Sequence, residues 1–150
     1  MVGRRMPITT WTTSPGREQP LMIPRGLRIA FIVHFAVDMI VGIPLFLFPS
    51  FLLGAIGWES IDPIFVRLFA AALLGIGLES LLGYNAEAKV YQAMLNLKIV
   101  WSLSAAAGIA LSLIYHPTYR IIWVWIGLAV FLGFNLLWLY WRLLLYHMTR

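Results

Sequence analysis

Two side chains that can exchange a proton lie four residues apart in an otherwise apolar stretch, FIVHFAVDMI, which covers residues 31–40. On a helix, this spacing puts His34 and Asp38 next to each other on one face. The pair could transfer protons, bind a cofactor through the imidazole, or form a buried structural contact. If the stretch crosses a bilayer, an acid facing lipid near the midplane is costly, so we expect both side chains to face protein.

Other polar side chains interrupt apolar stretches elsewhere, namely Arg67, Glu79, Lys98 and Asn135. From the helical rise of about 1.5 Å per residue, Glu79 and Lys98 lie at similar depth on successive spans, so we expect them to form an ion pair. Asn135 is expected to hydrogen-bond between helices. Arg67 either reaches the membrane interface or pairs with Asp38, for which His34 is the other candidate partner.

Motifs that would define a known chemistry are missing. The chain has no cysteine, which excludes disulfides, cysteine-ligated metal centres and thiol nucleophiles. It also lacks the HExxH, GxSxG, GxGxxG and P-loop patterns. The other histidines, His116 and His147, lie at the ends of spans, which argues against a bis-histidine haem. The cofactor is therefore unknown, and a haem, chlorophyll or quinone held by His34 and Asp38 stays open.

Composition indicates a membrane protein. Of 150 residues, 61% are hydrophobic and only 11% are charged, about half the charged fraction of a soluble domain. Four apolar stretches reach the roughly 20 residues that a helix needs to cross the hydrocarbon core. These stretches cover residues 27–48, 64–83, 94–115 and 121–141. The predicted fold is all-α: a polytopic integral membrane protein with a four-transmembrane-helix bundle over residues 27–146.

Two segments lie outside the predicted spans. Residues 1–26 are rich in Pro, Thr, Gly and Arg and form an extended or disordered N-terminal tail. Residues 49–60 are apolar but too short to cross, so they form either an interfacial segment or a loop with a few buried side chains.

Helix neighbours can also be predicted. Short links make the third span an antiparallel neighbour of both the second and the fourth. Small or polar residues at four-residue spacing are expected at the contacts, because they let helices approach closely. These series are Ala30-His34-Asp38-Gly42, Arg67-Ala71-Gly75-Glu79-Gly83, Ser104-Gly108-Ser112 and Ala129-Gly133, with Lys98 and Ser102 forming a separate pair.

Charge placement predicts the orientation. Most basic residues fall at one end of the four spans, whereas the other end has Arg67 and Arg120. The positive-inside rule then places both termini in the cytoplasm of a bacterium, with the chain in the inner (cytoplasmic) membrane. No basic stripe with interleaved aromatics lies outside the apolar segments, so no nucleic-acid partner is expected.

The second and third spans carry a family resemblance. The stretch PIFVRLFAAALLGIGLESLLGY, with an arginine shortly after a proline and a glycine pair at mid-helix, precedes a short polar turn and LNLKIVW. These two spans resemble small uncharacterised bacterial four-helix membrane proteins, broadly of the DoxX-like kind. The resemblance implies a four-helix membrane fold and no role for the arginine or the lysine.

Three functions remain in order of preference. The first is a non-catalytic accessory or structural subunit of a larger bacterial membrane complex, in contact with the lipid bilayer and with other membrane protein subunits. The second is a membrane-embedded protein that binds a small ligand or cofactor at His34 and Asp38. The third is a proton-coupled transporter or membrane enzyme that uses the same pair.

Overall fold

The computed structural model describes residues 22–58, 62–115 and 122–148, and every regular element in these ranges is an α-helix. The helices are α1 (Arg25–Leu47), α2 (Pro49–Ala55), α3 (Pro63–Leu82), α4 (Ala88–Tyr115) and α5 (Ile122–Met148). By length and composition, α1, α3, α4 and α5 can each cross a membrane, with mean hydropathies of 2.2, 1.9, 1.8 and 2.0. This confirms the all-α fold with four helices that are long and apolar enough to span a membrane, while their insertion in a membrane stays a prediction.

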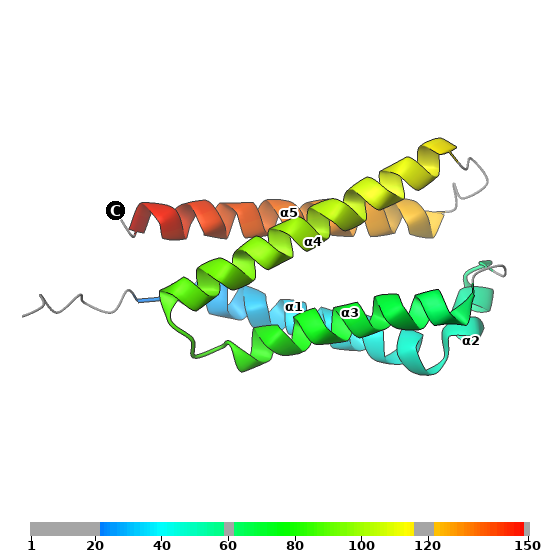
Figure 1. The fold of residues 1–150 in the computed structure, drawn as a ribbon, viewed down its shortest axis with the longest axis horizontal. Coiled ribbons are helices and arrows are strands. Elements are labelled where there is room, and N and C mark those ends of the chain that lie inside the picture. The colour runs from blue at the N-terminus through cyan, green and yellow to red at the C-terminus, as the bar shows by residue number, and fades with distance from the viewer. Residues whose placement is uncertain (1–21, 59–61, 116–121, 149–150) are drawn as a thin grey trace, which may run out of the picture.

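The long helices differ from the predicted spans mainly at the start of α4 and the end of α5, which lie at the same end of the molecule (Figure 1). Helix α4 begins at Ala88 rather than at residue 94, and α5 continues to Met148 rather than ending at residue 141. The first turn of α4 is helical because Tyr91 is fully buried there and its hydroxyl donates to the carbonyl oxygen of Tyr84 at 2.8 Å. Both helices therefore exceed the length that a hydrocarbon core requires.

The segments outside the spans are only partly described. The predicted tail, residues 1–26, lies outside the described residues up to position 21, and α1 already begins at Arg25. Between α1 and α3, Pro49 opens the short helix α2, which buries Leu53. Gly57 then reverses the chain with a φ of +77°, a conformation that glycine adopts without steric penalty. The segment is therefore helical rather than a loop over Pro49–Ala55, and its place at a membrane interface stays a prediction.

The long helices associate in two antiparallel pairs, α1 with α3 and α4 with α5 (Figure 1). Helix α4 runs antiparallel to α3, as predicted, but crosses it obliquely, so the two are neighbours over only a small contact (Figure 1). The α1–α3 pair is close because glycines meet larger side chains. A Cβ atom on Gly77 would lie 2.6 Å from the Cβ of Asp38, and one on Gly42 would lie 2.9 Å from Cδ2 of Leu74.

The two pairs join at the end of the molecule where α1 and α4 begin and α5 ends (Figure 1). The aromatic ring of Phe31 on α1 lies 4.9 Å from that of Tyr91 on α4 and 5.6 Å from that of Trp138 on α5. Gly26 lets the first turn of α1 approach Trp141, whose Cη2 would be 2.8 Å from an added Cβ. The hydrophobic core there consists of Ile23, Leu27, Phe31, Tyr91, Met94, Leu95, Trp138 and Leu145.

The predicted series on α1 is confirmed at His34, Asp38 and Gly42, which are buried, but most of the small residues predicted at contacts on the other long helices do not lie there. On α3, Ala70 and Gly77 are buried, whereas Ala71 and Gly75 are exposed, so the contact face is turned by one residue from the predicted series. The reason is the fit of Asp38 against Gly77, which fixes which side of α3 meets α1. The predicted series on α4 and α5 are exposed as well, at Ser104, Gly108, Ala129 and Gly133.

Candidate functional site

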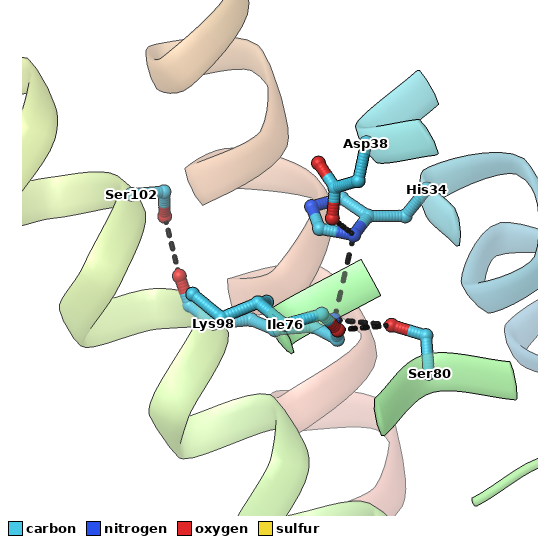
Figure 2. A network of polar contacts seen from close by, with 6 residues as sticks. All are labelled: His34, Asp38, Ile76, Ser80, Lys98 and Ser102. Carbon is cyan, nitrogen blue, oxygen red and sulfur yellow. Dashed lines mark hydrogen bonds and ion pairs between the residues drawn. The ribbon is translucent and has the colours of Figure 1, made fainter. Parts of the chain in front are cut away.

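The amino group of Lys98 is the centre of a polar network where α1, α3 and α4 meet (Figure 2). Lys98 is only 1% exposed. Its Nζ donates to the Oγ of Ser80 at 2.6 Å and to the carbonyl oxygen of Ile76 at 3.4 Å, and it lies 3.4 Å from Nδ1 of His34. The lysine of α4 is thus bound by groups from two other helices.

Aromatic rings complete the surroundings of this ammonium. Nζ of Lys98 lies 5.0 Å from the ring centroid of Phe31 and 5.4 Å from that of Trp138. The electron-rich ring faces attract a cation, and the attraction is stronger where water is excluded. These rings and the three polar contacts replace the hydration that a buried lysine loses.

His34 connects Lys98 to Asp38. Nδ1 of His34 lies 2.9 Å from Oδ2 of Asp38, and both residues are buried. Among the described residues no donor is well directed at Oδ2, which lies off the direction of the ring N–H. The contact is therefore a close electrostatic one rather than an aligned hydrogen bond. The prediction that this pair faces the interior is confirmed.

The tautomer of His34 decides which neighbour its Nδ1 serves. A protonated Nδ1 can donate toward Asp38, whereas an unprotonated Nδ1 can accept from Lys98. One ring nitrogen cannot do both at once. Chemically, the arrangement can either hold three helices together or move a proton among an acid, an imidazole and an amine.

A second set of hydrogen bonds ties α5 to the same place. Ser102 donates from its Oγ to the carbonyl oxygen of Lys98 at 2.7 Å. Asn135 on α5 donates from Nδ2 to Oγ of Ser102 at 3.0 Å and to the carbonyl oxygen of Ile99 at 2.9 Å. The predicted interhelical hydrogen bond of Asn135 is confirmed, and it reaches α4.

The predicted ion pair between Glu79 and Lys98 is not formed as a direct contact, although the charge of Glu79 still acts on Lys98. Lys98 is directed at Ser80, the next residue of α3, which is fully buried and donates to the carbonyl oxygen of Ile76 at 2.9 Å. Glu79 is only half-buried, and its Oε2 has no hydrogen-bond partner among the described residues. Ser80 was missed because a helical serine has no charge; the signal was its position three residues after Gly77, on the same face.

Arg67 does not reach Asp38. It is exposed near the start of α3, and its Nε donates to the carbonyl oxygen of Phe46 at 3.2 Å. Phe46 is in the last turn of α1, where carbonyl groups lack partners within the helix. Arg67 thus ties the start of α3 to the end of α1, and Asp38 is left with His34 as its neighbour.

Nothing in the described ranges forms a recognisable cofactor site around His34. Its ring packs edge-on against those of Phe134 and Trp138, with centroids at 4.8 and 5.1 Å. No group of three His, Asp or Glu side chains that could hold a metal occurs among the described residues. A cavity of about 410 Å³ lies elsewhere, between the start of α1 and Tyr84. A haem, chlorophyll or quinone at His34 and Asp38 therefore stays a prediction.

Comparison with known proteins finds no matching family model, no similar curated protein and no similar solved structure. The DoxX-like resemblance of the second and third spans therefore stays a prediction.

Proposed function

We propose that the chain is a four-span integral membrane protein that acts as a non-catalytic accessory subunit of a larger membrane assembly. The observation that carries this proposal is the position of the small residues that are not used inside the fold. Nothing lies within 4 Å of a Cβ added at Gly75, Gly108 or Gly133, on three different spans. In lipid, helices associate where small residues let their backbones approach, so these faces suit the helices of other subunits.

The buried polar network supports the same proposal. Lys98, Ser102 and Asn135 make their hydrogen bonds to other groups of the same chain. Such a closed network suits a structural role. The test is purification from the native membrane in mild detergent, with proteins that co-migrate identified and the visible spectrum recorded. Stable partners without an absorbing band support the accessory role; a porphyrin-type band and no partner would overturn it.

Gly108→Leu makes this test specific. The site of Gly108 is open within the chain, so the substitution should leave folding unchanged but reduce partner recovery. Leu103→Phe is the matched control, because Leu103 is 55% exposed and lies about 140° around α4 from Gly108. Equal recovery with Gly108→Leu and Leu103→Phe would refute the role of the glycine face.

The proposed location is a bacterial inner membrane with both termini in the cytoplasm. The support is the concentration of basic residues at the end where α1 and α4 begin and α5 ends, at Arg25, Arg28, Lys89 and Arg142 (Figure 1). Basic residues near the ends of spans favour the cytoplasmic side. Reporter fusions after residue 150 that are active only in the periplasm would contradict this orientation.

A second candidate function is proton-coupled transport, favoured by the shared contact of Asp38 and Lys98 with one nitrogen of His34. The test is proton flux into liposomes loaded with a pH-sensitive dye. Asp38→Asn should abolish the flux, whereas Glu79→Gln, which neutralises an acid outside this contact, should not. A protein that conducts no protons, or conducts equally with Asp38→Asn, excludes this candidate.

A further inference from the structure

A cavity lies beside the start of α1, away from the polar network around Lys98. Its volume is about 410 Å³. Its lining residues belong to the start of α1 and to the turn between α3 and α4, which carries Tyr84. The lining consists of Met22, Ile23, Arg25, Arg28, Ile29 and Tyr84.

The cavity has unused positive charge. Two of its lining residues are arginines and none is acidic. Nε of Arg28 is buried and has no hydrogen-bond partner among the described residues. The guanidinium carbon of Arg28 lies 5.5 Å from the ring centroid of Tyr84, so the aromatic ring holds this side chain in place. The guanidinium groups of Arg25 and Arg28, which line the cavity, supply the donors that an anion there would need.

The start of α1 adds to this positive character. Arg25 is its first residue, and the N-cap residue Pro24 has no side chain that can accept a hydrogen bond from the first turn. The partial positive charge at a helix start favours an anion there. Guanidinium groups, in turn, match the geometry of phosphate oxygens. The shared chemistry is therefore that of a phosphate group.

Apolar side chains indicate the source of that phosphate. Met22 is 86% exposed and Ile29 is 63% exposed, and both line the same cavity. A free phosphate ion has no use for these surfaces, whereas the glycerol and acyl chains of a lipid would cover them. Basic pockets between spans at the cytoplasmic side are known places for anionic headgroups.

We propose that this cavity binds the phosphate headgroup of an acidic phospholipid, with Arg25 and Arg28 as its ligands and Met22 and Ile29 against its acyl chains. The site rests on insertion of the chain in a membrane and not on the accessory role. It would fix the start of α1 to the leaflet that holds the acidic lipids.

The test uses the full chain in nanodiscs of phosphatidylcholine with one-fifth phosphatidylglycerol, followed by native mass spectrometry of the lipid that stays bound. Wild-type protein should retain phosphatidylglycerol. Arg25→Gln and Arg28→Gln should each weaken retention about fivefold, the effect expected of one basic residue near a membrane surface. Arg142→Gln is the matched control, because Arg142 belongs to the same end but is bound through Nε to Oδ1 of Asn96 at 2.9 Å.

Further arms separate the alternatives. Arg28→Lys keeps the charge and should lose less retention than Arg28→Gln, and circular dichroism verifies that each variant is folded. Inorganic phosphate at millimolar concentration should not displace the lipid; displacement would show a free-phosphate site and overturn the proposal. Equal retention by wild type, Arg25→Gln and Arg28→Gln would also overturn it. A further experiment uses nanodiscs of phosphatidylcholine alone. Failure of the chain to enter them would overturn membrane insertion itself, and with it both the lipid site and the accessory role.

Discussion

Replacing Lys98 by methionine should destabilise the fold by about 3–5 kcal/mol, the range for breaking one side of a buried charge contact. Methionine fills a similar volume without the charge. Lys98 is 1% exposed, and its loss removes the 2.6 Å hydrogen bond to Ser80. It also leaves the carboxylate of Asp38 without the nearest ammonium in a site that water does not reach.

The magnitude follows from the geometry. Nζ of Lys98 and Oδ2 of Asp38 both contact Nδ1 of His34, at 3.4 and 2.9 Å, so the two charges are at most about 6 Å apart. At an effective dielectric constant of about 20, charges at that separation attract by about 3 kcal/mol. The double variant Lys98→Met with Asp38→Asn removes both charges and should recover about 2–3 kcal/mol relative to Lys98→Met alone.

The assay is equilibrium unfolding by sodium dodecyl sulfate in mixed micelles, followed by tryptophan fluorescence. Ser80→Ala is the control, because it keeps both charges and removes only the hydroxyl that accepts from Lys98 and donates to the carbonyl oxygen of Ile76, at a cost of about 1–3 kcal/mol. If the double variant is as unstable as Lys98→Met, the charges of Lys98 and Asp38 are not coupled, and the reasoning is refuted.

Three further substitutions or deletions test other contacts. Gly77→Val should destabilise by about 1–3 kcal/mol because of crowding against Asp38, whereas Gly75→Val, in open space, should leave the unfolding midpoint unchanged; equal effects would contradict the packing. Asn135→Leu should lower the free energy of unfolding by about 1–3 kcal/mol in the same assay, because it removes the hydrogen bond to Ser102; an unchanged free energy would show that this bond is not formed. Deleting residues 1–21 should leave the bundle folded but reduce partner recovery in co-purification, and unchanged recovery would exclude docking by the tail.

The four long apolar helices could be predicted because each arises from one continuous apolar run of the sequence. A continuous apolar stretch of about 20 residues has few alternatives to a membrane helix, whatever its neighbours are. The pairing of the helices could not be predicted in this way. The link between α3 and α4 fixes only where their ends meet, while their crossing angle depends on contacts such as that of Lys98 with Ser80, which are distant in sequence.

The candidate site shows the same division between local and distant information. The spacing of His34 and Asp38 is local, and it placed both side chains in the interior correctly. The acceptor for Lys98 depends on the rotation of α3. Neighbouring residues on a helix point about 100° apart, so Glu79 and Ser80 cannot both face α4. The sequence favours the acid by charge, but the close approach of α1 at Gly77 turns the serine inward instead.

The polar network has a further consequence for how the spans are aligned. Apolar helices can slide along each other in lipid with little change in energy, because lipid tails solvate them as well as other helices do. A shift of α4 by one turn, about 5.4 Å, would carry the ammonium of Lys98 away from both Ser80 and His34. Only one alignment therefore satisfies the charge. The contacts of Lys98 with Ser80 and His34 thus fix the alignment of α4 against α3 and α1.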